Sequence, residues 1–474
     1  MRLSSIQLDR AVGAVLASAA GDALGSQYEF GPSLADDVIP RFGEGVFGHA
    51  AGEWTDDTSM AIPILDVLAR GDLIDTSTRE EIASRWIGWS RTAKDVGAQT
   101  RFVLSSVPRE FTEADIRDAS RRLHDHAGRS AGNGALMRTG PVALGYLTRP
   151  AEELADAART LSELTHWEAD SASACILWSA AIRHAILTGE LDVQGQLELL
   201  PAADAARWRA LIDETQDAHP REFIQSNGWV VRAFQGALAA VSGATSLVDA
   251  VERAVRGGGD TDTVAAIAGS LAGALWGGSA VPLSWKRRLH GWPGYAADDL
   301  VRQAVLAARG GKPDAEGWPS ADRLAQPGHS TRGTLAQHPH DDGVWIGSLA
   351  ALDRLPSEID AVVSLCRIGT KQVPEDLLSI QVWLVDQPDR NANLGWVLAE
   401  AADAVAELRA EGRTVFLHCA EGRSRTASVA ALYGARHRGV ALEQSWDDVS
   451  TALPDYTPQA FLREAVTRIQ NMES

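Results

Sequence analysis

Helical spacing of apolar residues dominates the first three hundred residues of the chain. Four large apolar residues mark one helix face near the start: Leu8, Val12, Val15 and Leu16. A later alanine-rich segment places Gly269 and Gly273 four residues apart. Glycines at that spacing let a neighbouring helix approach closely, as the central helix of a bundle requires. Strand patterns are weak in this part, so the pattern predicts an all-α domain over residues 1–308.

The pattern changes after about residue 308. Proline and glycine punctuate residues 309–341, which show little apolar periodicity. The residues concerned are Gly310, Gly311, Pro313, Pro319, Pro327, Gly328 and Pro339. This composition predicts a linker between two domains. Trp318 lies within the linker and can pin it onto a domain surface.

Strand and helix patterns alternate beyond the linker. Strands are predicted at 361–365, 382–385 and 414–418. Helices are predicted at 394–408, from Thr426 onward and near 461–469. This alternation favours a small parallel sheet flanked by helices, an α/β domain over residues 342–474.

Length, composition and charge limit the class of protein. A chain of 474 residues is too long for one ordinary core, so two or three domains are expected. Hydrophobic residues make up 45% and charged residues 23%, as in soluble globular proteins. The net charge of −19 argues against direct nucleic-acid binding, which needs a basic face. An anionic substrate stays compatible with this charge, because a metal centre or an anion-binding loop can dominate the local field.

The cysteines and the apolar runs indicate a cytoplasmic protein. Cys175, Cys366 and Cys419 are too few and too scattered for a disulfide framework. The first residues lack the apolar run and cleavage site of a secretory leader. No stretch is long and apolar enough to span a bilayer, so no membrane partner is expected.

Two short clusters rich in oxygen ligands precede apolar, helix-like stretches: Thr55-Asp56-Asp57 and Asp260-Thr261-Asp262-Thr263. Four carboxylates meeting at one place would repel each other unless cations lay between them. Carboxylate and hydroxyl ligands suit hard ions, and two Mg²⁺ or Mn²⁺ ions sharing carboxylates form a known catalytic arrangement. The alternative is that Asp and Thr only cap the two helices.

Further motifs accompany these clusters in a characteristic order. They are Gly21-Asp22-Ala23-Leu24-Gly25, Glu29, Asp95-Val96-Gly97, Gly132-Asn133-Gly134-Ala135-Leu136-Met137-Arg138 and Thr165-His166. Together with the two clusters they resemble the ADP-ribosylglycohydrolase family, which includes the enzyme that de-ADP-ribosylates dinitrogenase reductase. The resemblance covers about residues 8–308. It implies an all-α domain with a dinuclear metal centre at the bottom of an ADP-ribose cleft.

The resemblance also implies roles for individual residues. The metal ligands would be Thr55, Asp56, Asp57, Asp260, Asp262 and Thr263. Glu29 would be a catalytic carboxylate on the loop that guards the cleft. The substrate-binding residues would be Asp95, Gly132, Asn133, Gly134 and His166. Two alternatives remain, since His166 could be a core histidine and Gly132–Gly134 could simply join two helices. Gln99 departs from the family pattern, which often has Thr at this position near the ribose.

A second chemistry follows the last predicted strand, in His418-Cys419-Ala420-Glu421-Gly422-Arg423-Ser424-Arg425-Thr426. A Cys, five residues and an Arg between a strand and a helix can wrap backbone N–H groups around one phosphate. These dipoles and Arg425 would keep Cys419 as a nucleophilic thiolate. Gly422 permits the tight bend, and Thr426 can donate a proton to the departing sulfur. Cys175 and Cys366 are interpreted as small buried apolar residues.

This segment resembles the signature of cysteine-dependent phosphatases, and residues 342–470 resemble the dual-specificity phosphatase group, with Val344–Ser348 similar to its entry strand. The group needs a general acid on a loop after a strand. Asp386 is the predicted acid and Asp389 the second choice, while a solvated turn residue is the alternative for Asp386.

The sequence therefore predicts a bifunctional hydrolase. It would cleave the glycosidic bond of ADP-ribose adducts with the help of metal and hydrolyse phosphate monoesters at Cys419. Its partner would be an ADP-ribose-type substrate, including an ADP-ribosylated or phosphorylated protein. One alternative is a C-terminal domain that only binds phosphate or phosphoprotein. The other is an ADP-ribose sensor without catalysis.

Overall fold

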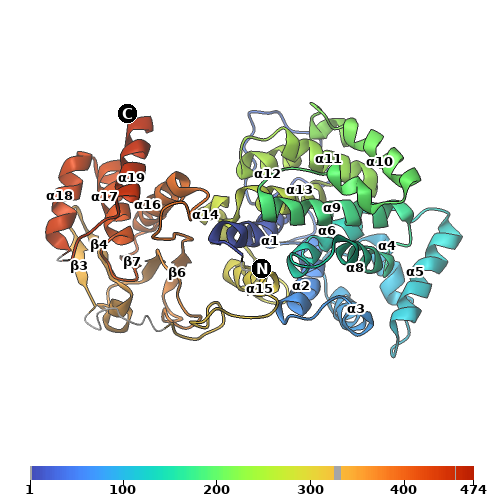
Figure 1. The fold of residues 1–474 in the computed structure, drawn as a ribbon, viewed down its shortest axis with the longest axis horizontal. Helices are drawn as coiled ribbons and strands as arrows, with labels where there is room; N and C mark the ends of the chain where they lie inside the picture. The colour runs from blue at the N-terminus through green and yellow to red at the C-terminus, as the bar shows by residue number, and fades with distance from the viewer. Residues whose placement is uncertain (1–2, 325–332, 454, 474) are drawn as a thin grey trace. The chain divides into compact units, whose positions relative to one another are not determined.

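The computed structural model describes residues 3–324, 333–453 and 455–473, and these residues form two compact units (Figure 1). The first unit comprises the described residues up to Val281 together with Arg288–Lys312. The second comprises Pro282–Arg287 and the described residues from Pro313 onward. Among the residues described, no helix combines the length and apolarity that crossing a bilayer requires.

The first unit is helical, as predicted. Its longer helices are α1 (Ser5–Gly25), α2 (Asp56–Ala69), α3 (Thr76–Ser90), α4 (Ala98–Ser105), α5 (Glu113–Ala127), α8 (Ala151–Glu163), α9 (Ala169–Thr188), α10 (Ala202–Asp213), α11 (Val230–Ser242), α12 (Leu247–Arg256), α13 (Thr261–Trp276) and α15 (Ala297–Ala308). Its short helices are η1 (Asn133–Ala135), α6 (Leu136–Thr139), α7 (Val142–Gly145), η2 (Gly195–Leu199), η3 (Pro220–Phe223) and η4 (Gly278–Ala280). The only strands in its described part are β1 (His290–Gly291) and β2 (Tyr295–Ala296), which pair antiparallel.

Helices α1 and α13 form the centre of this unit and pack backbone to backbone. A Cβ atom on Gly273 would lie 1.9 Å from the carbonyl oxygen of Gly13, and one on Gly269 would lie 2.1 Å from that of Ala17. A Cβ on Gly21 would lie 2.2 Å from the carbonyl oxygen of Ala265. The partner numbers fall as the α1 numbers rise, so the two helices run antiparallel. The close approach predicted for Gly269 and Gly273 is confirmed, and it brings the end of α1 to the start of α13.

The second unit is built on a five-stranded sheet in the order β3-β4-β7-β5-β6. Its strands are β3 (Leu335–His338), β4 (Asp341–Ser348), β5 (Ala361–Ser364), β6 (Leu378–Gln381) and β7 (Val415–Cys419). Only β3 pairs antiparallel; the other neighbours are parallel. The carboxyl ends of β4, β5, β6 and β7 therefore lie at one edge of the sheet, where α/β proteins carry their sites.

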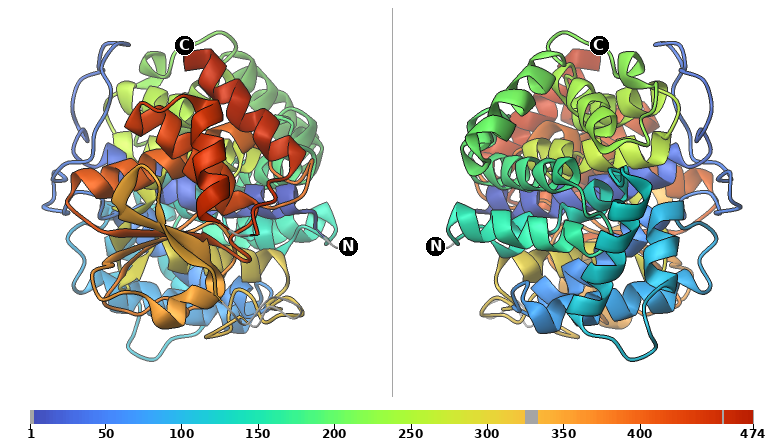
Figure 2. Two further views of the ribbon diagram at one scale, coloured as in Figure 1. Left: turned by 90° about the vertical axis from the view of Figure 1, so that its left-hand side faces the viewer. Right: turned by 90° about the vertical axis from the view of Figure 1, so that its right-hand side faces the viewer.

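Four longer helices pack on this sheet or on one another beside it (Figure 2). They are α16 (Leu394–Ala410), α17 (Arg425–Arg438), α18 (Leu442–Ala452) and α19 (Ala460–Glu473), and the unit also contains α14 (Leu283–Lys286) and η5 (Leu349–Arg354). Helices α16 and α17 pack against the sheet, while α18 and α19 pack against α17. The predicted α/β architecture is confirmed.

One predicted strand, 382–385, is wrong. The strand next to β5 is β6, which ends at Gln381. Val382 makes a last hydrogen bond, from its N–H to the Ser364 oxygen at 2.9 Å, and the chain then leaves the sheet. The apolar run continues because Val382 and Leu384 are buried in the hydrophobic core of this unit while their neighbours are more exposed, which produces the same alternation as a strand.

The segment 309–341, predicted as a linker, contains ordered structure. Strand β3 and the first residue of β4 lie inside it, and Trp318 is only 5% exposed. Residues 325–332, with Pro327 and Gly328, lie outside the described residues. The boundaries 1–308, 309–341 and 342–474 stay predictions.

Candidate functional site

The two oxygen-rich clusters lie at the N-termini of two helices. Thr55 is the N-cap residue of α2, and Asp56 and Asp57 are its first two residues. Asp260 is the N-cap residue of α13, whose first turn carries Asp262 and Thr263. The positive ends of both helix dipoles therefore favour the negative charge of these carboxylates.

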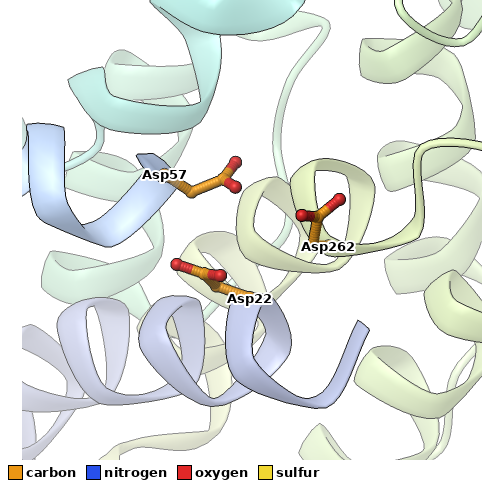
Figure 3. Close-up of side chains that lie close together, drawn as sticks. All are labelled: Asp22, Asp57 and Asp262. Atoms are coloured by element: carbon orange, nitrogen blue, oxygen red, sulfur yellow. The ribbon is translucent and has the colours of Figure 1, made fainter. Parts of the chain in front are cut away.

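The structure brings carboxylates from three helices together (Figure 3). Ligand atoms of Asp22, Asp57 and Asp262 all lie within 4.8 Å of one another. A second group with the same spacing consists of Glu29, Asp260 and Asp262. Asp262 belongs to both groups, which is the arrangement that two cations sharing one carboxylate would need.

Burial and mutual repulsion disfavour the charged forms of these groups. Burial, then the neighbouring carboxylates, raises the pKa of Glu29 to about 8 and that of Asp56 to about 7. The same causes hold the pKa values of Asp57 and Asp262 well above their usual range. Asp57 Oδ1 is buried and accepts no hydrogen bond from the residues that the structure describes. The donor set and this unsatisfied oxygen both fit a hard divalent cation.

Asp22 fixes the position of the first cluster. One of its oxygens accepts hydrogen bonds from the Thr55 N–H at 2.9 Å and the Thr55 hydroxyl at 2.8 Å. The other accepts from the Thr58 N–H at 3.0 Å and the Thr58 hydroxyl at 2.6 Å. Thr55 makes no side-chain capping bond within the described helix, so Asp22 caps α2 from another helix. The capping alternative therefore does not account for Thr55, whose hydroxyl also lies 3.0 Å from Asp57 Oδ2.

The glycine turn at Gly132–Gly134 lies beside the second cluster. Asn133 donates from Nδ2 to Asp260 Oδ2 at 2.7 Å. The turn packs onto the ring of His166, because a Cβ on Gly132 would lie 3.2 Å from His166 Nε2 and one on Gly134 would lie 3.2 Å from Cε1. The predicted substrate residues Asn133 and His166 are thus brought together, with Asn133 in contact with a carboxylate of the cluster.

His166 and Arg138 lie in the interior behind this turn. Burial lowers the pKa of His166 well below its usual value, and its Nδ1 lies 2.8 Å from the Thr165 hydroxyl. Arg138 is fully buried, donates to the same hydroxyl at 2.6 Å and stacks on Trp86 at 4.1 Å. Arg138 is therefore a core residue that supports the Thr165–His166 segment.

The segment Asp95–Gln99 lies between the first acidic cluster and the loops that carry Gly132 and His166. Asp95 is partly exposed and contributes to the raised pKa of Asp56, while the Gly97 N–H donates to Asp56 Oδ2 at 3.4 Å. Gln99 donates from Nε2 to the Ser130 oxygen at 2.8 Å and to the Thr165 oxygen at 2.9 Å. Gln99 thus ties together the two loops that carry Gly132 and His166.

A second site lies at the carboxyl edge of the sheet in the other unit. Strand β7 ends at the buried Cys419, and α17 begins at Arg425. Gly422, between them, has φ +74°, and a Cβ there would lie 2.8 Å from the Gly347 backbone. Both observations require glycine at this position. The loop therefore has the tight bend that a phosphate-binding loop needs.

Arg425 is anchored by backbone carbonyls of two neighbouring segments. Its Nη1 donates to the carbonyl oxygens of Leu365 at 2.8 Å and Leu384 at 3.1 Å. Its Nε is buried and finds no acceptor among the described residues. The carboxylate oxygen Asp386 Oδ2 lies 3.6 Å away from it, beyond hydrogen-bond distance, so this N–H can still donate to an oxyanion.

The structure separates the two predicted acids. Asp386 accepts a hydrogen bond from the Ser424 hydroxyl at 2.9 Å and lies 3.6 Å from Arg425 Nε. Asp389 is exposed in a turn, at φ +58°. Asp386 is thus placed at the loop, as expected for an acid. The hydroxyl of Thr426 donates to the Gly347 oxygen at 3.1 Å, so in this conformation its acceptor is a backbone carbonyl and not the Cys419 sulfur that was predicted.

Three residues of these sites were missed by the sequence reasoning: Asp22, Thr58 and Ser424. A local signal existed for Asp22, which is a single carboxylate inside the alanine-rich stretch of α1. Ser424 lies within the Cys419 signature, but the contacts of Thr58 and Ser424 could not be read locally, because their partners Asp22 and Asp386 are 36 and 38 residues away.

Comparison with known proteins assigns the larger part of the chain. Its C-terminal part is similar to dual specificity protein phosphatase 1 of Arabidopsis thaliana, at 27% identity over 129 residues, 26% of this chain and 64% of that protein. The solved structure of human DUSP28 matches 32% of this chain and 99% of its own length, with 20% identity and a TM-score of 0.27. The ADP-ribosylarginine hydrolase Tri1 of Pseudomonas putida is 34% identical over 284 residues, 60% of this chain and 74% of that protein. The family model for ADP-ribosylglycohydrolase matches residues 3–315. With the acidic clusters in the positions described above, the chain belongs to the ADP-ribosylglycohydrolase family.

Proposed function

We propose that the helical unit hydrolyses the glycosidic bond of an ADP-ribosyl adduct and uses divalent metal to do so. The observation that carries this proposal is the position of Asp262 in two carboxylate groups at once, one with Asp22 and Asp57 and the other with Glu29 and Asp260. Family membership supports the reaction class.

The residues that would hold two Mg²⁺ or Mn²⁺ ions are the predicted ligands Thr55, Asp56, Asp57, Asp260, Asp262 and Thr263. When bound, the ions would polarise the ribose oxygens and offset the charge of the carboxylates. Asn133 keeps Asp260 oriented through the bond at 2.7 Å, and Asp22 keeps the first turn of α2 in place. Glu29 is the half-buried carboxylate beside this group and would accept a proton from the attacking water.

The substrate class we propose is an arginine-linked ADP-ribose. The support is the relative from Pseudomonas putida, which is named an ADP-ribosylarginine hydrolase and is 34% identical to this chain. The test is to incubate the full chain with ADP-ribosylarginine and, separately, with a serine-linked adduct, and to measure released ADP-ribose with Mg²⁺, with Mn²⁺ and with a chelator. Metal-dependent release from the arginine adduct is expected. Equal release in excess chelator would contradict metal dependence, and binding of ADP-ribose without any release would favour the sensor.

We further propose that the α/β unit is a cysteine-dependent phosphatase. The observation that carries it is the pairing of Arg425 with Asp386 beside the Cys419 loop: the buried Arg425 Nε makes no hydrogen bond to the described residues and lies 3.6 Å from the Asp386 carboxylate. The Cys419 thiolate would attack the phosphorus, and the bond to the leaving oxygen would break as Asp386 gives that oxygen a proton. Water would then attack the phosphocysteine, Asp386 would take the proton, and phosphate and the thiolate would be released.

The test of the second activity is phosphate release from an aryl phosphate and from phosphopeptides by the full chain. Turnover that the metal chelator leaves unchanged is expected, because the proposed nucleophile is a thiolate. Binding of inorganic phosphate or vanadate without any turnover would favour a phosphate-binding module instead.

A further inference from the structure

A segment that precedes the predicted phosphatase domain is bound to the loops of the Cys419 site. We call residues 313–324 the strap. The backbone N–H groups of Thr370 and Lys371 donate to the strap carbonyls of Ala321 at 3.0 Å and Asp322 at 2.9 Å. The Leu324 N–H donates to Gln372 Oε1 at 2.8 Å. These bonds attach the strap to the loop that follows β5, the neighbour of β7.

Trp318 is the apolar centre of the strap. It is 5% exposed, the guanidinium of Arg367 lies over its ring at 4.2 Å, and the ring of Trp383 meets its own edge to face at 5.8 Å. Asp314 supports this position, because it accepts from the Trp318 N–H at 2.9 Å and pairs with Arg367 at 2.9 Å. The indole of Trp318 thus packs together with Asp314, Arg367 and Trp383.

Trp383 begins the short segment that carries the proposed acid. The Leu384 oxygen accepts from Arg425, the Val385 N–H donates to Asn391 Oδ1 at 2.8 Å, and Asp386 accepts from Ser424. Because β6 ends at Gln381, no strand ladder holds residues 383–386. Their position therefore depends on these contacts and on the burial of Leu384, and at the N-terminal end Trp383 packs on Trp318.

We propose that Trp318 is a positioning residue for the phosphatase reaction: through Trp383 it holds Asp386 at the Cys419 loop. This inference rests on the proposed phosphatase function. It means that the phosphatase unit requires the strap, which lies before residue 342. Loss of the indole leaves a cavity beside Trp383, and the acid then spends less time in reach of the leaving oxygen.

Dependence on the leaving group separates this role from a general loss of stability. An aryl phosphate with a strongly acidic phenol departs without much help from an acid, whereas phenyl phosphate needs the proton. In full-length Trp318→Ala we expect kcat for phenyl phosphate to fall about tenfold or more, because general acids contribute roughly 10²–10⁴-fold. We expect a much smaller change in kcat for the aryl phosphate with the strongly acidic phenol. For phenyl phosphate, the decrease of kcat at high pH, where the general acid loses its proton, should become weaker. Trp318→Phe should restore most of the loss.

Trp446 offers a matched control. It is also a buried tryptophan of this unit, 2% exposed, and it lies in α18, where its ring neighbours are Arg463 at 4.9 Å and Tyr456 at 6.2 Å. Trp446→Ala should leave the ratio of activities on the two esters unchanged. If Trp318→Ala does not fold, Asp314→Ala loosens the strap while keeping the indole and should change the same ratio in the same direction.

The outcomes are distinguishable. A wild-type chain that hydrolyses neither ester overturns the phosphatase function itself. A wild-type chain that hydrolyses both, with an unchanged ratio in Trp318→Ala and Asp314→Ala, overturns the positioning role while the phosphatase function stands. An equal change of ratio in Trp446→Ala also overturns it.

Discussion

Asp22 Oδ2 accepts hydrogen bonds from both the backbone N–H and the hydroxyl of Thr58, at 3.0 and 2.6 Å. Through this contact the last turn of α1 fixes the first turn of α2, where Asp56 and Asp57 lie. Since α1 also packs backbone to backbone on α13, the same helix sets the distance between the two carboxylate clusters. The geometry of the candidate metal centre thus depends on the four hydrogen bonds that Asp22 accepts from Thr55 and Thr58.

Asp22→Asn should weaken both stability and metal binding. An amide nitrogen cannot accept the hydrogen bonds that one carboxylate oxygen accepts now, so buried donors of α2 lose their partner. We expect the free energy of unfolding to fall by about 1–3 kcal/mol, measured by urea denaturation without metal. Asp9→Asn is the control, because Asp9 is buried in the same helix and bonds Ser279 instead. It should cost stability while leaving the affinity for Mg²⁺ unchanged, and equal losses of Mg²⁺ affinity in the two variants would contradict the role of Asp22.

Stabilisation by Mg²⁺ should increase with pH. Burial and neighbouring carboxylates raise the pKa of Glu29 to about 8 and that of Asp56 to about 7, above their values in the unfolded chain. Between about pH 4 and 8 the metal-free folded protein therefore binds more protons than the unfolded chain, and its stability falls as pH rises. A cation binds the ionised carboxylates and offsets this loss. The increase in Tm on adding Mg²⁺ should be larger at pH 8 than at pH 6, with NaCl of equal ionic strength as the control; a larger increase at pH 6 would refute it.

Asp262→Asn should be the most damaging single change at the candidate metal centre, because Asp262 belongs to both carboxylate groups. Changes to residues behind metal ligands typically cost roughly 10–100-fold, so we expect a loss of glycohydrolase activity on the order of 100-fold or more. Asp66→Asn provides the comparison, since Asp66 is a buried carboxylate of α2 that pairs with Arg85 at 2.7 Å. Released ADP-ribose is the measure, and a similar loss in both variants would point to a general effect of removing buried charge.

Cys419→Ser should abolish phosphatase activity and leave glycohydrolase activity intact. A hydroxyl is a far weaker nucleophile than a thiolate, and the two sites lie in separate compact units. We expect a decrease of roughly 10³-fold or more in phosphate release. Cys175→Ser, a change at a buried cysteine of the helical unit, controls for the loss of a thiol. Retained phosphatase activity in Cys419→Ser would contradict the assignment of Cys419 as the nucleophile.

Asp386→Asn and Asp389→Asn should separate the two candidate acids. Asp386 bonds Ser424 beside Arg425, whereas Asp389 is exposed in a turn. Asp386→Asn should slow turnover of phenyl phosphate by about 10²-fold while vanadate binding stays near normal. Asp389→Asn should change neither quantity much. The assignment is wrong if the effects of the two substitutions are reversed.

Features that depend on neighbouring residues could be predicted from the sequence. Thr55-Asp56-Asp57 and Asp260–Thr263 were recognised as helix starts because polar oxygens precede an apolar stretch, and α2 and α13 do begin there. The Cys419–Arg425 loop was recognised for the same reason, since its residues are adjacent in the chain. The close packing at Gly269 and Gly273 also follows from spacing alone.

Features that depend on residues distant in the chain were decided by the tertiary structure. The run 382–385 alternates like a strand, yet β6 ends at Gln381. Val382 and Leu384 are buried in the core without strand pairing of the run, and this burial produces the same pattern. Arg138 ends the motif that begins with the Gly132–Gly134 turn, yet it is fully buried and stacks on Trp86 in the core. Neither outcome is visible in local periodicity.

By itself the sequence determined two architectures, the two clusters of oxygen ligands and the cysteine loop, because local patterning and residue chemistry specify them. The tertiary structure alone decided that Asp22 caps α2, that Asp386 and not Asp389 lies at the loop, and that Trp318 packs on Trp383. These contacts join residues from 36 to 65 positions apart, and only the packing of whole helices and strands brings such residues within a few ångströms.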